Sequence, residues 1–288
     1  MNAFFRRLTA ACALTGLLAA CSSTGFTPAG DLSLSEQPLL GKFVWHDLMT
    51  DDVEAAKRFY GGLLGWEFEQ VTHPRGGDYT LAKAGGHYVG GLVLLADRID
   101  ADYSRWLPYL SVADVDSAVR ATESAGGVVV VGPLELGNLG RAAAITDPQG
   151  AVLGLMRSRV GDPDDSLPPA TGRVVWNELL AADEASAAQF YNELAGLEIV
   201  PIARRGGEYI VLRAQGRERA GIMERPDEGV TPLWLTHFAV ADVDAATRRA
   251  AELGGQVLLA PAAELRDGML AVVTDPTGAV LALQQLPK

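Results

Sequence analysis

A histidine beside an aspartate in an apolar strand is the first place in this chain where chemistry is possible. The stretch FVWHDLMTDD, residues 43–52, contains His46 and Asp47. An imidazole can bind a divalent metal or move protons near neutral pH, and a carboxylate can serve either purpose. Because side chains alternate across a strand, His46 and Asp47 point to opposite faces. A site on one face can therefore use only one of them.

The four histidines of the chain restrict any metal site. His73 precedes Pro74 and is expected in a solvated hairpin loop, and His87 follows two glycines and is expected at a turn or a rim. The second half of the chain contains His237 alone. A site built from two histidines is therefore impossible within that half.

Aromatic side chains recur along the chain and offer surface for a ligand. For Trp45 and Trp176, in apolar strands, the sequence leaves core packing and a pocket wall open. Trp106 and Trp234 enter strands and are expected in a cleft wall, where an indole supplies apolar area and one donor. The Phe-Tyr pairs at 59–60 and 190–191 are expected in the core between helix and sheet.

Other catalytic patterns are missing from the sequence. There is no G-x-S-x-G turn, no glycine-rich loop that leads into Lys-Ser or Lys-Thr, and no pair that reads as a nucleophile with its base. The tetrapeptides DPQG and DPTG are typical of type I turns rather than phosphate sites.

The chain repeats itself after the first forty residues. VWHDLMTDDVEAAKRFY returns as VWNELLAADEASAAQFY at an offset of 131, and VADVDSAVRATESAGG and TDPQGAVLGL return at 128. This is a duplicated domain, because the period is too long for a solenoid repeat. We predict domain 1 at residues 42–158 and domain 2 at 172–286. The Pro- and Asp-rich residues 159–171 are the expected linker.

Each domain should contain the same elements twice. Asp51 or Asp52 can cap a helix that ends near Gly61-Gly62, and a second helix is expected from Asp114 to Gly126-Gly127. The order predicted is strand, helix and three strands, so that each domain has two βαβββ modules.

The order D…FY…LGW, GG.Y, V.DVD…GG and DP.GAV resembles the vicinal oxygen chelate superfamily, which includes glyoxalase I, bleomycin resistance proteins and extradiol dioxygenases. The resemblance covers nearly all of residues 42–286. It implies an α+β fold in which a tandem duplicated domain, each of two βαβββ modules, forms a half-open mixed sheet barrel. In such proteins the ligand lies on the concave face.

Catalytic members of that superfamily typically hold a divalent metal on two histidines and a glutamate. Their spacing places these ligands at positions that here lack donors for such a metal, and His46 is one residue out of register. No metal and no cofactor are therefore expected. The corresponding positions are Trp45, Leu107, Gly154, Trp176, Leu235 and Ala282.

The polar residues two positions away from these metal-ligand positions should point to the same, concave face of the sheet. An inward-facing carboxylate is costly to bury without a partner, so a ligand, a water or a donor should face it. The sequence leaves open whether these groups line a pocket or make hydrogen bonds within the protein. The candidate ligand-binding residues are Trp45, Asp47, Tyr79, Trp106, Tyr109, Trp176, Glu178, Tyr209, Trp234 and His237.

Two functions remain. The first, which we favour, is a metal-free module that binds a small, partly aromatic molecule that is neutral or cationic. The second is an enzyme of the superfamily that uses other groups, for example Asp47 or Glu178 as a general base near Tyr109 or His237. No catalytic residue can be assigned from the sequence, and pure partner recognition is a weaker third reading.

The first residues resemble a bacterial lipoprotein signal. Arg6 and Arg7 precede an apolar run that ends in Leu-Ala-Ala-Cys. We expect a signal peptide at 1–20, lipidation of Cys21 and a spacer at 21–41, flexible to about Gln37. Ser22 after the cysteine predicts the outer membrane, facing the periplasm.

The charge and the cysteines narrow the partners. The formal net charge is −12, which argues against nucleic acid and anionic lipid. The lipid anchor would then be the only membrane contact. The cysteines number two, and one lies inside the signal, so no internal disulfide is expected in the mature chain. A duplicated chain can pair its own domains, and a monomer with packed domains is predicted.

Overall fold

The computed structural model describes residues 34–73, 76–95, 104–204 and 207–287. The predicted signal peptide and Cys21 lie outside the described residues, as does most of the predicted spacer. None of the described helices is long and apolar enough to cross a membrane.

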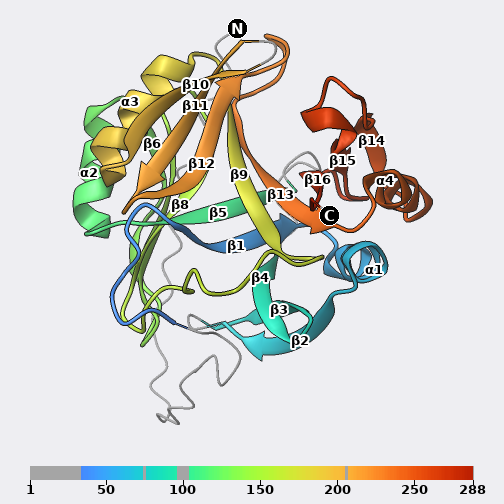
Figure 1. Ribbon diagram of the computed structural model, residues 1–288. Coiled ribbons are helices and arrows are strands. Elements are labelled where there is room, and N and C mark those ends of the chain that lie inside the picture. Colours follow the sequence, from blue (N-terminus) through green and yellow to red (C-terminus); the bar gives the residue numbers. More distant parts are fainter. Residues whose placement is uncertain (1–33, 74–75, 96–103, 205–206, 288) are drawn as a thin grey trace, which may run out of the picture.

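Domain 1 is one eight-stranded sheet with two helices. The strand order is β2-β3-β4-β1-β5-β8-β7-β6, which is open at both ends and confirms the half-open arrangement of two βαβββ modules (Figure 1). The elements are β1 (Phe43–Thr50), α1 (Val53–Leu64), β2 (Glu67–Thr72), β3 (Asp78–Ala84), β4 (His87–Leu94), β5 (Arg105–Ser111), α2 (Val115–Ser124), β6 (Val128–Glu135), β7 (Gly140–Thr146) and β8 (Val152–Ser158).

Domain 2 repeats this topology, with the order β10-β11-β12-β9-β13-β16-β15-β14. A short 3-10 turn, η1, is inserted before β15. The elements are β9 (Val174–Ala181), α3 (Glu184–Ala195), β10 (Glu198–Arg204), β11 (Gly207–Ala214), β12 (Arg217–Glu224), β13 (Leu233–Val240), α4 (Val243–Glu252), β14 (Gln256–Leu259), η1 (Arg266–Gly268), β15 (Leu270–Thr274) and β16 (Val280–Gln285).

The helices begin where the aspartates predict. The side chain of Asp52 accepts a hydrogen bond from the backbone N–H of Ala55, and Asp114 accepts one from Ser117. Such caps satisfy donors that have no partner within the helix. Helix α1 ends at Gly65, whose left-handed φ of 69° is open to glycine at little cost. Asp183 and Asp242 repeat the cap in domain 2.

The two modules of each domain pair with one another at the centre of the sheet. Strand β1 runs parallel to β4 and antiparallel to β5, so that Asp47 lies opposite Leu107 and Trp45 opposite Tyr109. In domain 2, β9 and β13 place Glu178 opposite Leu235. The candidate residues of both modules therefore meet in the middle of each sheet.

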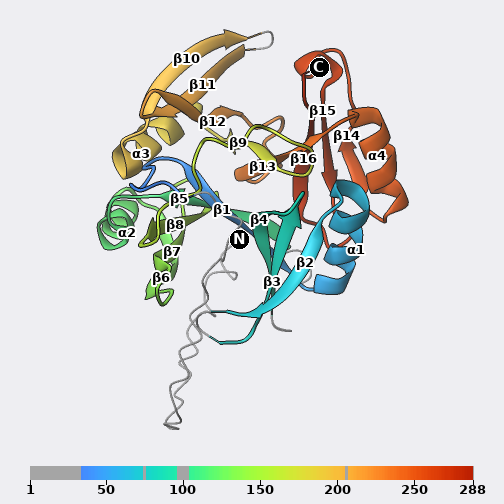
Figure 2. The same ribbon diagram turned by 60° about the horizontal axis from the view of Figure 1, so that its bottom comes forward.

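The two domains pack through their helix-covered faces and share their cores. Helix α1 lies beside α4, and α2 lies beside α3 (Figures 1 and 2). Each of the two large apolar clusters contains residues of both domains. The concave faces of the two sheets are therefore directed away from the contact between the domains.

Tyrosines of the first helix in each domain connect the domains. The hydroxyl of Tyr60 donates to Asp275 at 3.1 Å, and that of Tyr191 donates to Asp147 at 2.9 Å. Both aspartates belong to the predicted DP-x-G turns. The tyrosines are fully buried, as the sequence predicted for a helix-to-sheet core, and they also supply matched polar contacts across the domain boundary.

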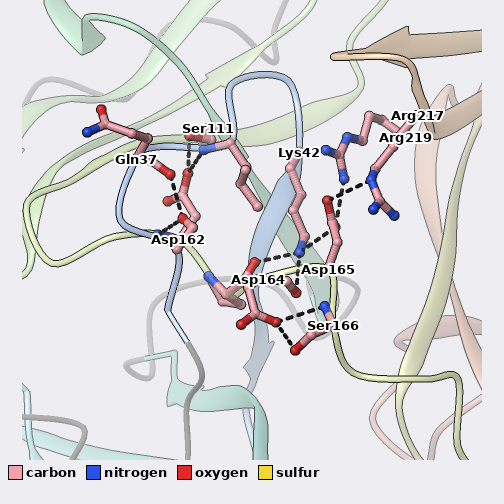
Figure 3. Close-up of polar contacts among 12 residues, drawn as sticks. Gln37, Lys42, Ser111, Asp162, Asp164, Asp165, Ser166, Arg217 and Arg219 are labelled. Carbon is pink, nitrogen blue, oxygen red and sulfur yellow. Dashed lines mark hydrogen bonds and ion pairs between the residues drawn. The ribbon is translucent and has the colours of Figure 1, made fainter.

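The linker and the chain before β1 hold one another in place (Figure 3). The carboxylate of Asp162 accepts hydrogen bonds from the backbone of Leu39 and the hydroxyl of Ser111, each at 2.7 Å. Lys42 and Arg219 pair with Asp165 at 2.9 and 2.8 Å. Ser35 donates its backbone N–H to Asp162, so the expected flexibility up to Gln37 does not extend over residues 35–37.

Candidate functional site

A buried carboxyl group lies at the centre of the concave face of domain 1. Asp47 is 7% exposed, and its Oδ1 accepts hydrogen bonds from Trp45 Nε1 at 2.9 Å and from the Tyr79 hydroxyl at 2.6 Å. The Tyr109 hydroxyl hydrogen-bonds to the same carboxyl. Four of the predicted site residues therefore form one cluster, contributed by β1, β3 and β5.

Two glycines make room for the tyrosine rings. A Cβ atom at Gly91 would lie 1.9 Å from the Tyr79 hydroxyl, and one at Gly154 would lie 2.3 Å from the Tyr109 ring. Such distances are far inside van der Waals contact. Gly154 is also one of the positions at which the resemblance places a metal ligand. The absence of a side chain there lets Tyr109 lie over the sheet.

An open cavity of about 290 Å³ lies over this cluster. Its wall is mainly apolar, and the end of the cavity is formed by Leu34 and by Val160, Gly161, Asp162 and Pro163 of the linker. The apolar wall includes Val44, Met49, Leu81, Val93, Leu107, Leu134, Leu139, Ala144 and Met156. A cavity of this kind suits a small molecule with an apolar body and few polar groups.

Burial controls the protonation of the cluster. It raises the pKa of Asp47, and the hydrogen bonds from Tyr79, Trp45 and Tyr109 oppose the shift without cancelling it. Burial and the charge of Asp47 also raise the pKa of Tyr79 and Tyr109 well above that of an exposed tyrosine. Both tyrosines are therefore hydroxyl donors at neutral pH.

The concave face of domain 2 has the same framework with a different interior. Glu178 accepts from the Tyr209 hydroxyl at 2.7 Å, and Trp176 Nε1 donates to the same hydroxyl at 2.9 Å. Arg266 Nη2 lies 2.9 Å from Glu178 Oε1 and forms an ion pair in which Glu178 is buried and Arg266 is partly exposed. The place above the carboxylate is thus taken by a side chain of the protein.

The predicted pairing of His237 with Glu178 is present. His237 Nε2 lies 3.6 Å from Glu178 Oε2, and Nδ1 lies 3.0 Å from Gln284 Oε1. Burial lowers the pKa of His237 to about 4, although Glu178 acts to raise it. Burial acts to raise the pKa of Glu178, but His237, Arg266 and Tyr209 outweigh it and hold the pKa below its ordinary value. At neutral pH the ion pair consists of Glu178 and Arg266, with a neutral His237.

Arg266 reaches this position from a strained turn. Arg266 and Asp267 have φ values of 47° and 56°, which are left-handed and unfavourable for residues other than glycine. At the offset of 128 residues, the corresponding position in domain 1 is Asn138, an exposed residue. The two domains therefore differ in their interior because one turn carries an arginine inward.

The placement of Trp106 and Trp234 in a concave cleft wall is wrong. Both are 4% exposed, and their indole N–H groups donate to Tyr60 and Tyr191 at 2.9 Å. Trp106 neighbours Leu107 in the strand, so it points to the opposite, helix-covered face. The two indoles pack in the cores between the domains.

The other histidines occupy three different environments. His46 faces away from the cavity, as predicted, and its Nε2 lies 3.0 Å from Asn177 Oδ1 at the contact between the domains. Burial lowers the pKa of His46 to about 4. His73 lies in the hairpin between β2 and β3, as expected, but it is only partly exposed, because it lines the cavity and its ring packs edge-on against Tyr79. His87 begins β4.

The positions at which the resemblance places a metal do not fit a divalent ion. Trp45, Leu107 and Gly154 offer no suitable donor atom, and Trp176, Leu235 and Ala282 offer none in domain 2. Within the described parts of the chain, no group of three or more His, Cys, Asp or Glu side chains could hold a metal ion. No chemical step can be derived through a metal at these positions.

Sequence reasoning missed Asp162 and Arg266. Composition predicts that Asp162 belongs to the linker, and nothing in its neighbours indicates that it lines the cavity of domain 1. Arg266 had a visible signal, because the sequences of the two domains diverge around residues 135–140 and 263–268, between two well-matched segments. A segment where two otherwise matching copies differ in sequence indicates a position where their structures or functions differ.

Paired βαβββ modules with a central cluster on the concave face define a tandem glyoxalase-type protein. The chain belongs to the Glyoxalase/Bleomycin resistance protein/Dioxygenase superfamily, whose profile matches residues 42–155. A glyoxalase-like domain profile matches residues 173–283. The vicinal oxygen chelate resemblance and its two-domain form are thereby confirmed.

Two relatives match most of the chain. CFP32 of Mycobacterium tuberculosis, provisionally named a glyoxylase, is 36% identical over 244 residues, which are 83% of this chain and 92% of CFP32. The anthracycline biosynthesis protein DnrV of Streptomyces peucetius is 33% identical over 261 residues, which are 85% of this chain and 94% of DnrV.

Solved structures share the fold at low sequence identity. The Mn(II)-bound glyoxalase of Novosphingobium aromaticivorans has a TM-score of 0.54 and 17% identity, and the alignment covers 86% of this chain and 83% of that chain. The 2,2',3-trihydroxybiphenyl 1,2-dioxygenase of Sphingomonas wittichii has a TM-score of 0.57 and 14% identity, with 86% and 91% covered. These similarities concern the fold alone.

Proposed function

We propose that domain 1 binds a small molecule with a partly aromatic, apolar body in the cavity over Asp47. The observation that carries the proposal is the cavity of about 290 Å³, whose mainly apolar wall surrounds one buried carboxyl group with its donors. An apolar body would gain by leaving water, and the polar cluster would orient it.

The second domain supports the assignment to domain 1. There the matching carboxylate already pairs with a cation of the chain, since Arg266 Nη2 lies 2.9 Å from Glu178 Oε1. DnrV is named for the biosynthesis of anthracyclines, which are fused-ring aromatic molecules, and this name is in keeping with an aromatic ligand. We therefore assign the binding function to one of the two concave faces.

A library screen with a cavity-filling variant tests this proposal. Neutral, anionic and cationic aromatic compounds are tested by thermal shift, and the hits are measured by isothermal titration. Ala144 lines the cavity beside Gly154, so Ala144→Phe should abolish binding of the hits. The matched control is Val272→Phe, at the corresponding position of domain 2, which should leave affinity unchanged. Hits that respond only to Val272→Phe, or a library without hits, would contradict the proposal.

A second candidate is a metal-independent enzyme with Asp47 as general base. The observation in its favour is that burial raises the pKa of Asp47, as in many catalytic carboxyl groups. The provisional name of CFP32 is in keeping with such an activity. Asp47 would remove a proton next to a substrate carbonyl, and the electron pair would move to the carbonyl oxygen.

Deuterium exchange separates this candidate from binding alone. The protein is incubated with 2-hydroxyacetophenone in D2O, and loss of the proton next to the carbonyl is followed by NMR. The enzyme candidate would be supported by exchange that is faster with the protein than in buffer alone and that falls to the buffer rate with the Asp47→Asn variant. Exchange at the buffer rate for a compound that binds would leave binding as the function.

We also propose that the protein is an envelope lipoprotein of the outer membrane, anchored through Cys21 and acting as a monomer. The order of Arg6, Arg7, an apolar run and Leu-Ala-Ala-Cys supports the anchor, and Ser22 after the cysteine supports the outer membrane. The packing of the two domains within one chain supports the monomer. Cys21→Ser should move the protein from the membrane fraction to the soluble fraction. Firm membrane association of that variant would remove the lipoprotein proposal.

A further inference from the structure

Two buried carboxyl groups line the domain 1 cavity. Asp47 is 7% exposed and Asp162 is 1% exposed, and both belong to the lining of the same open cavity. Among the described residues that line this cavity, none is a lysine or an arginine. A negative charge that loses water without a positive partner is costly, so the cavity favours a positively charged occupant.

Asp162 has an oxygen without a partner. Its Oδ2 accepts two hydrogen bonds, from the backbone of Leu39 and from Ser111, whereas Oδ1 is buried and has none. A buried acceptor that is left unpaired loses its hydration without compensation. Asp162 therefore keeps a carboxyl group with incomplete hydrogen bonding next to the cavity.

Asp47 is supported by uncharged donors. The indole of Trp45 and the hydroxyls of Tyr79 and Tyr109 hydrogen-bond to its carboxyl group, and each of these donors is neutral at neutral pH. His73, which also lines the cavity, favours the charged form of Asp47 through its own charge. The carboxyl group is therefore oriented, and none of the described lining residues offers it a permanently charged partner such as lysine or arginine.

Domain 2 shows which partner this carboxyl position takes. Glu178, the equivalent of Asp47, is met by the guanidinium of Arg266 at 2.9 Å. The framework around the two carboxyl groups is otherwise matched, with Trp176 and Tyr209 in place of Trp45 and Tyr79. Domain 2 thus contains an internal ligand, a planar cation on an alkyl chain, where domain 1 has a cavity.

We propose that the ligand of domain 1 is an organic cation, in which an apolar or aromatic body carries an amidinium, guanidinium or ammonium group that pairs with Asp47. Asp162, in the lining of the same cavity, adds negative potential. This inference rests on the proposed function and names the class of molecule that the cavity takes.

Benzamidine and benzamide test the inference on the unmodified protein. The two compounds have nearly the same shape, and only benzamidine carries a positive charge. Isothermal titration of the full mature chain should give at least tenfold tighter binding of benzamidine. Benzamide binding as tight as benzamidine would overturn the cation and leave the proposed function standing. If neither compound binds and the aromatic library also gives no hits, the proposed function fails as well.

Variants locate the charge recognition. Asp47→Asn should remove most of the preference for benzamidine over benzamide, and Asp162→Asn should reduce it further. The control is Asp51→Asn, which removes one exposed negative charge outside the cavity and should change the preference less than twofold. A preference that survives in Asp47→Asn, or that falls equally in Asp51→Asn, would show that the general acidity of the protein and not the cavity attracts the cation. The comparison of the two compounds on the unmodified protein stands even if a variant fails to fold.

Discussion

The concave faces of the two domains share a framework and differ in what fills it. In domain 1, Asp47 lies beneath an open cavity and is held by two tyrosines and an indole. In domain 2, Glu178 is covered by Arg266 and lies beside His237. The helix-covered faces, by contrast, carry matched contacts in both copies, such as those of Tyr60 and Tyr191. Duplication has kept the contacts that join the domains and has allowed the two interiors to diverge.

The difference between a bound side chain and a bound ligand is also a difference in stability. A charge that belongs to the chain is brought into place during folding, whereas a free cation costs translational entropy each time it binds. The ion pair of Glu178 and Arg266 is therefore expected to contribute to the folding of domain 2. Domain 1 is expected to gain the same kind of contact only when its ligand is present.

The largest expected effect concerns the ion pair of domain 2. Arg266→Ala leaves Glu178 buried without its cation and should lower the free energy of unfolding by about 3 kcal/mol, measured by urea denaturation. Glu178→Gln in the same chain should recover much of this loss, because the uncompensated charge is removed. Asn138→Ala, at the matching exposed position of domain 1, should change stability by less than about 0.5 kcal/mol. Equal losses from the two alanine variants would remove the contrast between the domains.

The next effect is a loss of stability at acid pH that arises from His237 in domain 2 and has no counterpart at Asp47 in domain 1, whose pKa is raised. Burial lowers the pKa of His237 to about 4 in the folded chain, while the unfolded chain has the ordinary value near 6.5. The unfolded state therefore takes up this proton first, and stability is lost as the pH falls from about 6.5 to about 4. The lowered pKa of Glu178 acts in the same direction at the acid end.

The contribution of His237 can be isolated by difference. His237→Gln should make the fall in stability between pH 6.5 and pH 4 smaller by about 2 to 3 kcal/mol than in the unmodified chain. His46→Gln should have an effect of the same sign, since burial also lowers the pKa of His46 to about 4. The raised pKa of Asp47 has the opposite effect on the pH dependence of stability, and this effect is the same in every variant that retains Asp47. An unchanged pH profile in His237→Gln would show that this histidine is not buried in its neutral form.

The smallest expected effect distinguishes Trp106 and Trp234, on the helix-covered faces, from Trp45, which lines the cavity. Trp106→Phe and Trp234→Phe each remove an indole N–H that donates to a buried tyrosine, and each should cost about 1 to 2 kcal/mol of stability. Neither should change ligand affinity, because both indoles lie on the helix-covered faces. Trp45→Phe should weaken binding of the library hits severalfold. If Trp106→Phe weakened ligand binding without lowering stability, the indole of Trp106 would belong to the binding site.

The periodic parts of the sequence were sufficient to predict the fold. The caps at Asp52 and Asp114, the DP-x-G turns and the offset of 128 to 131 residues depend on local chemistry and on repetition, and the structure shows elements at these places. Alternation across β1 was also enough to direct His46 away from the concave face. The same rule, applied to Leu107, would have placed Trp106 correctly.

The contents of the two interiors depend on contacts that local patterns do not encode. Asp162 reaches the cavity because the linker packs against residues 35–42, which are distant from it in sequence. Arg266 turns inward because two residues adopt left-handed backbone conformations that no motif predicts. The framework of each site could therefore be predicted, but its occupancy could not.

A crystal structure with the tightest-binding compound of the aromatic library tests the central claim most directly. We predict that the compound lies in the domain 1 cavity, with a donor within hydrogen-bond distance of Asp47, and that the ion pair of Glu178 and Arg266 is intact. A compound bound beside Glu178 with Arg266 displaced, or bound on the helix-covered side of either sheet, would contradict the division of roles between the two domains.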